Sequence, residues 1–111
     1  MEQRYLLLNE RSKREILNYL PSCNETEKLA DFFQVFSDAT RLKIISCLAM
    51  CDMCVNDLST LLKINQTTIS HQLKYLKSQH LISSKRNGKI IVYSLTNQKT
   101  NELMLSAVNA I

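Results

Sequence analysis

Two cysteines near the middle of the chain have the residue type and spacing best suited to chemistry. Cys51 and Cys54 stand at C-x-x-C spacing, so their thiolates can share one ion, and thiolates favour Cd(II), Pb(II) or Zn(II). Cys23 and Cys47 complete the set of cysteines. In a reducing compartment these residues are free thiols or metal ligands rather than disulfides. The pair predicts a thiol site, with two alternatives: ordinary unliganded residues, or a reversible redox pair.

A second chemical pattern lies downstream, in a polar stretch without a carboxylate. Ile69, Leu73 and Leu76 fall at helical spacing and form the apolar stripe of a helix over residues 66–78, which we call the reading helix. A solvated helix would mix acids and bases at i, i+4, whereas this helix offers hydrogen-bonding groups and cations that suit base edges and phosphates. We predict double-stranded DNA contacts from Gln66, Thr67, Thr68, Ser70, His71, Gln72, Lys74, Tyr75 and Lys77.

Charge is distributed unevenly along the chain. The net charge is +4, yet residues 58–101 contain seven cations and no aspartate or glutamate. Such a window is typical of a polyanion-binding surface, although a solvated basic face is the alternative interpretation. Lys85, Arg86 and Lys89 form a cluster within it, and we expect all three to neutralise phosphates.

Two shorter helices are expected to position the reading helix. Asp38 is a candidate N-cap for a helix over residues 39–50, and a second helix covers residues 55–62. A three-residue turn follows, and its last residue, Asn65, is placed to cap the reading helix. Residues 55–78 therefore predict a helix-turn-helix, although its turn lacks the glycine often found there.

After His80 the apolar period changes from 3.6 to 2, which indicates strands. Residues 81–86 and 89–95 are joined by Asn87-Gly88, a strong hairpin signal because a type I′ turn needs positive φ at both residues. A hairpin with a cationic tip directly after a helix-turn-helix is a wing. We predict this wing over residues 81–95.

The N-terminal extension, residues 1–20, is expected to hold one short helix. Ser12 and Glu15 have the spacing of a capping box, and Pro21 stops the helix at Leu20. The first residues mix acids and bases and have only a short apolar run, which does not resemble a signal peptide.

Two further helices have apolar faces that favour pairing between two copies. Residues 24–37, with Asn24 as the expected cap, hold all three phenylalanines of the chain. Residues 97–111 form a last helix with little apolar surface left to cover in its own domain. We therefore predict that these first and last helices of the domain form the interface of a homodimer.

Length and composition bound the class of protein. The chain has 111 residues, 45% apolar and 22% charged, which predicts a single globular domain, mainly α with a small β-hairpin. No apolar run is long enough to span a membrane, and we expect a cytoplasmic protein. A thiol oxidoreductase would need a strand leading into the cysteine pair within a βαβ unit. The pattern lacks that unit, so we do not expect an enzyme.

Residues 29–111 resemble the arsenic-repressor (ArsR/SmtB-type) family of winged helix-turn-helix transcriptional repressors. The resemblance rests on FFQVFSDATRLKIISCL, on TISHQLKYL and on the wing. It implies a homodimer that binds an imperfect inverted repeat at its own promoter and releases it on sensing a ligand. The two reading helices of such a dimer lie about 34–36 Å apart, one DNA turn.

The resemblance also bears on the cysteines. Where the family has Cys-Val-Cys-Asp-Leu as metal ligands, this chain has Asn56 in place of the second cysteine, with Cys51 as the candidate substitute. By resemblance, As(III) joins the candidate ions and Cys23 becomes a third ligand donated across the dimer. The family's other site, on the last helix, uses Asp and His, and no histidine follows His80. We expect no cofactor beyond a regulatory ion, with thiol-redox or persulfide sensing, or no inducer, as alternatives.

Overall fold

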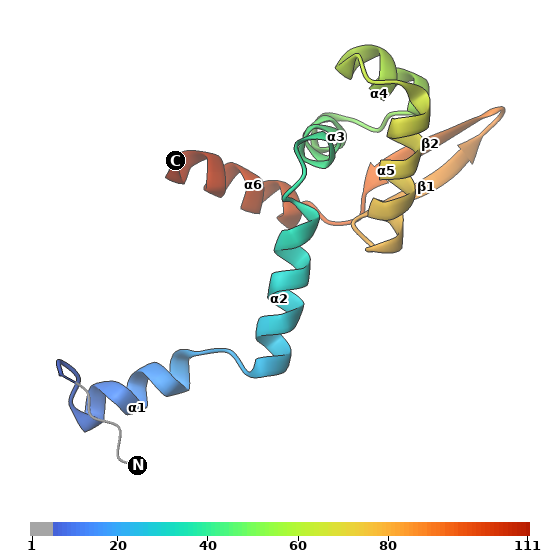
Figure 1. Cartoon of the computed structure of the whole chain (residues 1–111). Coiled ribbons are helices and arrows are strands. Elements are labelled where there is room, and N and C mark those ends of the chain that lie inside the picture. The colour runs from blue at the N-terminus through green and yellow to red at the C-terminus, as the bar shows by residue number, and fades with distance from the viewer. Residues whose placement is uncertain (1–5) are drawn as a thin grey trace. The chain divides into compact units, whose positions relative to one another are not determined.

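The computed structural model describes residues 6–111 (Figure 1). The chain divides into two compact units, which are described separately: the residues up to Phe33, and Gln34–Ile111. In chain order the elements are α1 (Glu10–Tyr19), α2 (Cys23–Val35), α3 (Ala39–Met50), α4 (Val55–Leu62), α5 (Gln66–Ser78), β1 (Ile82–Asn87), β2 (Ile90–Leu95) and α6 (Lys99–Ala110).

In the first unit, α1 begins three residues earlier than the sequence predicted. The side chain of Asn9 accepts a hydrogen bond from the Ser12 amide at 2.8 Å, so Asn9 and not Ser12 is the N-cap. The helix ends at Tyr19 because Leu20, which precedes Pro21, is extended at φ −64° and ψ 136°. The rest of the predicted N-terminal extension, residues 1–5, lies outside the described residues.

The start of α2 also differs from the prediction, which placed its cap at Asn24. Ser22 Oγ accepts from the Glu25 amide at 3.1 Å and donates to Glu25 Oε1 at 3.1 Å, so the cap lies two residues nearer the N-terminus than predicted. Further along α2 the rings of Phe32 and Phe33 pack edge to face, with centroids 5.6 Å apart.

In the second unit, α3, α4 and α5 pack around a fully buried core that includes Ile44, Leu58, Ile69, Leu73 and Leu76. Each such side chain contributes about 1.5–3 kcal/mol through burial. The predicted stripe of the reading helix is therefore confirmed. It fixes which face of α5 is turned inward and which is free for binding.

Both predicted caps in this unit are confirmed. The side chain of Asp38 accepts from the Arg41 amide at 3.1 Å, and that of Asn65 accepts from the Thr68 amide at 2.8 Å. The turn between α4 and α5 needs a left-handed residue, and Lys63 takes this role at φ 58° and ψ 43°. The absent glycine is thus replaced by a strained lysine.

The predicted wing is present, but its turn is shifted by one residue. β1 and β2 pair antiparallel with Asn87 opposite Ile90, which leaves Gly88 and Lys89 as the two turn residues. Gly88 has φ +65°, whereas Asn87 and Lys89 have no positive φ. The prediction of a type I′ turn at Asn87-Gly88 is therefore wrong. A positive φ at the first central position alone is the pattern of a type II′ turn, which favours glycine there.

The segment between Cys51 and Cys54 joins the same sheet, a pairing that the sequence analysis did not predict. The Met53 amide donates to the Tyr93 carbonyl at 3.2 Å, and the Tyr93 amide donates to the Met53 carbonyl at 2.8 Å. Met53 thus adds a single-residue third strand beside β2. This pairing attaches the cysteine segment to the wing.

The last helix, α6, is slightly shorter than the predicted span of residues 97–111, and the side chain of Asn97 accepts from the Lys99 amide at 2.9 Å. It lies against α3 and buries Thr100. Leu105 and Val108 remain exposed in the single chain. Across residues 6–111, every helix is too short or too polar to cross a membrane.

Candidate nucleic-acid interface and thiol segment

The outer face of α5 presents most of the predicted DNA-contacting side chains to solvent. Three of them, Thr68, Gln72 and Tyr75, are half-buried. The exposed members are Gln66, Thr67, Ser70, His71, Lys74 and Lys77. The helix therefore combines a buried apolar stripe with an exposed face of donors, acceptors and cations.

The first residue of α5 is tied to α4. Gln66 Nε2 donates to Asn56 Oδ1 at 3.0 Å. Asn56 is the residue that replaces a cysteine of the family pattern, and no sequence motif predicted its contact with Gln66. The residue that weakens the expected metal site therefore orients a candidate DNA-reading side chain.

A residue absent from the predicted site, Arg41, contacts the middle of α5. Its guanidinium carbon lies 4.7 Å from the centroid of the Tyr75 ring, and its Nη1 donates to Gln72 Oε1 at 3.4 Å. Arg41 belongs to the SDATRLKI segment, on which the family resemblance partly rests, but that segment predicts no contact with α5. No local pattern connects Arg41 with Gln72, which lies 31 positions later in the chain.

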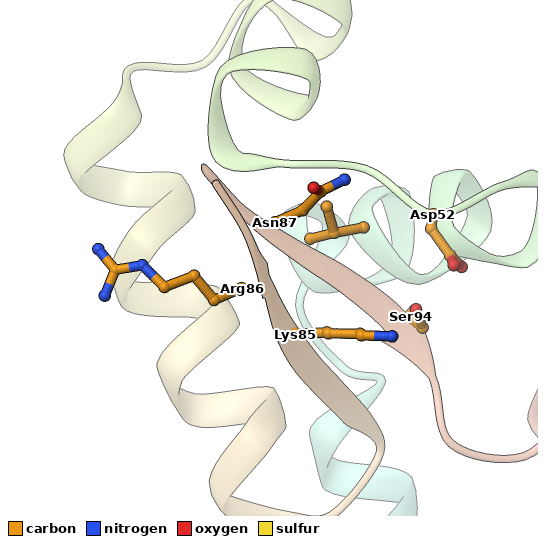
Figure 2. Close-up of a pocket in the computed structure, with 6 residues that line it drawn as sticks. Asp52, Lys85, Arg86, Asn87 and Ser94 are labelled. Carbon is orange, nitrogen blue, oxygen red and sulfur yellow. The ribbon is translucent and has the colours of Figure 1, made fainter. Parts of the chain in front are cut away.

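The wing cations lie on different faces of the hairpin. Lys77 Nζ donates to Ser84 Oγ at 2.6 Å, which places the β1 face of Ser84 and Arg86 toward α5. Figure 2 shows Lys85 pointing to the opposite side, toward Ser94 and Asp52, while Arg86 points away from them. Lys89 is exposed in the turn. The basic cluster therefore splits, with Arg86 facing α5 and Lys85 facing away from it.

Lys85 borders a shallow cavity of about 310 Å³ that is also lined by Asp52, Arg86, Asn87, Val92 and Ser94 (Figure 2). Asp52 lies between the two cysteines of the C-x-x-C segment. The far face of the wing thus meets the thiol segment, and Met53 joins the two through its backbone.

The predicted thiol ligands occupy three positions. Cys51 is exposed and follows α3, Cys54 is half-buried and is the N-cap of α4, and Cys23 is the exposed first residue of α2. The Cys54 amide donates to Asp57 Oδ2 at 3.2 Å. Between residues 6 and 111, no group of three or more Cys, His, Asp or Glu side chains is placed to hold a metal ion.

A second open cavity, of about 420 Å³, lies beside Cys51 and is lined by Cys51, Asp52, Met53, Asn56, Asp57, Thr60 and Leu61. Cys47 differs from its neighbours because burial raises the pKa of its thiol, and the nearby Cys51 raises it further. Cys47 is thus held as a neutral thiol, which suits a small residue that packs in the interior.

Comparisons with known proteins identify the family. The description "Bacterial regulatory protein, arsR family" matches residues 38–84. A transcriptional repressor SmtB homolog from Synechocystis sp. is 33% identical over 90 residues, covering 81% of this chain and 68% of that protein. The cadmium resistance transcriptional regulatory protein CadC from Listeria innocua is 33% identical over 100 residues, covering 89% and 80%.

The structure of the transcriptional repressor BigR from Xylella fastidiosa superposes with a TM-score of 0.74 at 26% identity, covering 88% of this chain and 95% of that chain. The protein belongs to the arsR family of bacterial regulatory proteins. The predicted fold, a winged helix-turn-helix, is confirmed. These relatives are regulators of transcription and not enzymes.

Proposed function

We propose that the protein is a sequence-specific transcriptional repressor that binds an inverted-repeat operator in double-stranded DNA as a homodimer. One observation carries the proposal: the exposed face of α5 has hydrogen-bonding side chains and cations but no carboxylate. A basic wing follows α5 directly, so both reach the same side of a duplex. We propose a cytoplasmic location, because a repressor must reach the DNA.

The proposed contacts divide by chemistry. Amide, hydroxyl and imidazole groups reach base edges, whereas cations and one phenol contact phosphates and set the register. The base-edge group is Gln66, Thr67, Thr68, Ser70, His71 and Gln72. The phosphate group is Lys74, Tyr75, Lys77, Lys85, Arg86 and Lys89. We assign the smallest share to Lys85, which faces away from α5, and a reduced share to Tyr75, which packs against Arg41.

The homodimer is proposed from apolar surface that one chain leaves uncovered. On α6, Leu105 and Val108 are 56% and 66% exposed, and on α2, Leu29 and Phe33 are 48% and 53% exposed. We propose that α2 and α6 bury these side chains against a second copy. In that arrangement two-fold symmetry presents two reading helices to the two halves of an inverted repeat.

The inducer is proposed to be a thiophilic ion, Cd(II), Pb(II), As(III) or Zn(II), bound by Cys51 and Cys54 with Cys23 as third ligand. Cys23 would come from the partner subunit, as the family resemblance suggests. The cadmium resistance regulator among the relatives supports a thiophilic inducer. Release follows from linkage: the ion must bind the low-affinity conformation more tightly than the DNA-bound one.

Two contacts offer a route from the thiols to DNA. Asn56 lies in the cavity beside Cys51 and holds Gln66, and Met53 is paired with β2 of the wing. A change in the thiol segment therefore acts on both DNA-contacting elements. The same route serves the alternative inducers, oxidation or persulfidation of the thiols, while a repressor without an inducer would use neither.

DNA binding is tested by selecting duplexes from a random pool with the purified protein, then comparing the selected operator with a scrambled duplex by fluorescence anisotropy. We expect a strong preference for an inverted repeat, with binding that weakens steeply as salt rises. Binding that is equal for both duplexes, or insensitive to salt, would refute the proposal. Sedimentation equilibrium on the same sample tests for the dimer.

The inducer is tested by titrating the reduced protein–operator complex with Cd(II), Pb(II), As(III), Zn(II) and peroxide in turn. Release by an ion, abolished by Cys51→Ser or Cys54→Ser and retained by Cys47→Ala, is the expected result. The ion's affinity should rise with pH because thiolate binding releases protons. Release by peroxide alone would favour the redox alternative, and release by none of them a repressor without an inducer.

A further inference from the structure

Arg41 links the end of α2 to the reading helix. Its Nε donates to the Val35 carbonyl at 2.6 Å and its Nη2 to the Gln34 carbonyl at 3.4 Å. These carbonyls belong to the last turn of α2, where helix carbonyls lack intrahelical partners. A cation at this end of a helix also complements its dipole.

The other side of the same guanidinium meets α5. Its plane lies over Tyr75 and its Nη1 reaches Gln72 Oε1. Gln72 and Tyr75 are three positions apart and therefore share one face of the helix. A lysine keeps the charge but has neither the fork of donors nor the flat surface that allows these contacts together.

The contact with Gln72 fixes the sense of its amide. A guanidinium has donors only, so the glutamine atom that faces it must be the carbonyl oxygen. The NH₂ group of Gln72 is consequently turned the other way. A glutamine that is free to rotate can turn either its donor or its acceptor outward, whereas this one has its carbonyl oxygen turned toward Arg41 and its NH₂ group turned away from it.

We propose that Arg41 is a positioning residue that makes Gln72 a donor in DNA reading. Gln72 then favours a base edge that offers an acceptor, such as purine N7, guanine O6 or thymine O4, over the cytosine N4 donor. The inference rests on the proposed function of α5. The inference adds the orientation of the Gln72 amide and names Arg41, outside α5, as the residue that determines this orientation.

The first test uses Arg41→Lys, Gln72→Ala and the double variant on the selected operator and on a scrambled duplex. Arg41→Lys should lower operator affinity on the order of tenfold and leave the scrambled duplex within about twofold. The double variant should lose no more than Gln72→Ala alone, because Arg41 acts through Gln72. The slope of log affinity against log salt should not change.

The second test is Gln72→Glu, which keeps the side chain's shape and removes its donor. The carboxylate can pair with Arg41 through one oxygen and present the other, so preference at one base pair of each half-site should move toward cytosine N4. This change of preference would not arise from a merely structural role, and it keeps the test decisive if Arg41→Lys does not fold.

Three outcomes overturn the inference. Equal losses on both duplexes, with the salt slope reduced by about 0.9, would make Arg41 a phosphate contact itself. A folded Arg41→Lys that binds as the parent does, or a Gln72→Glu with unchanged base preference, would also refute it. If instead the parent protein selects no sequence from the pool, the proposed function fails rather than this inference.

Discussion

The two glutamines of α5 are held in opposite senses. Gln66, at the N-terminal end of the helix, uses its NH₂ group to bond Asn56, which leaves its carbonyl oxygen free. Gln72 uses its carbonyl oxygen to bond Arg41, which leaves its NH₂ group free. The same residue type on one helix thus turns its acceptor away from its anchor at one position and its donor away from its anchor at the other. The neighbours, and not the side chain alone, decide what each reader can recognise.

Arg41 and Asn56 also differ in how firmly each fixes the orientation of its glutamine. Arg41 can only donate, so it permits one orientation of Gln72. Asn56 can donate or accept, so an exchange of both amide groups would preserve its bond with Gln66. Arg41 is also half-buried, whereas Asn56 is exposed and lies in the cavity beside Cys51. We therefore expect the amide of Gln72 to keep one orientation when it contacts a base, and the amide of Gln66 to be able to reverse.

The largest expected effect comes from Leu73→Ala, which removes the support beneath both glutamines. Leu73 is fully buried, so the free energy of unfolding should fall by about 2–5 kcal/mol. Specific DNA binding should be lost with it. Urea denaturation followed by circular dichroism measures the change. Lys74→Ala, one residue along on the exposed face, is the control and should stay within about 0.5 kcal/mol.

Next in size is the contrast between two matched variants, Gln66→Glu and Gln72→Glu. Both add a negative charge and should weaken binding to every duplex. Gln66→Glu should keep its base preference, because its free group was already an acceptor, whereas Gln72→Glu should change preference by about 1–3 kcal/mol. Competition binding with operators changed at single base pairs gives both values. Identical behaviour of the two variants would remove the distinction between them.

A smaller effect is expected for cations that bind phosphate and leave both glutamines untouched. Lys89→Ala should weaken binding similarly for all sequences, on the order of threefold to tenfold, and reduce the salt slope by about 0.9. Lys85→Ala is the matched variant and should have less effect, since Lys85 faces away from α5. Anisotropy titrations at several salt concentrations measure the slopes. A larger loss from Lys85→Ala would contradict the division of the wing into two faces.

The smallest effect concerns the reactivity of Cys47. The raised pKa of this thiol keeps it neutral under the conditions in which the two glutamines are compared. Its alkylation by iodoacetamide should be slow near neutral pH and accelerate only above the usual thiol pKa, about 8.5. Because the pKa of Cys47 is higher in the folded state, its contribution to the free energy of unfolding is fully present below the pKa of the unfolded state. That contribution is lost as the pH rises through the pKa of the folded state. Peptide mass spectrometry measures the rates, with exposed Cys23 as the faster comparison.

Local patterns were enough to predict much of this molecule. The apolar period of α5, the caps at Asp38 and Asn65 and the two strands of the wing depend on residues a few positions apart. Where two local signals competed, the prediction was wrong. Ser22 prevailed over Asn24 as a cap, and the hairpin turn moved to Gly88-Lys89 because the strands pair with Asn87 opposite Ile90.

Contacts between distant residues could not be predicted from the sequence. Arg41 with Gln72, Asn56 with Gln66, and Met53 with Tyr93 each join separate elements, and neither residue of a pair marks the other. They are also the contacts that bear most on DNA reading. The individual DNA contacts and thiol ligands stay predictions.

The Met53–Tyr93 pair has a consequence for how the protein folds. A hairpin of two strands is marginal on its own in water, and here it gains a third strand from a residue about forty positions earlier in the chain. The loop between these residues contains α4 and α5, so we expect it to close after the helix-turn-helix has formed. We expect the wing to be the last part of the DNA-binding surface to assemble and the first to open.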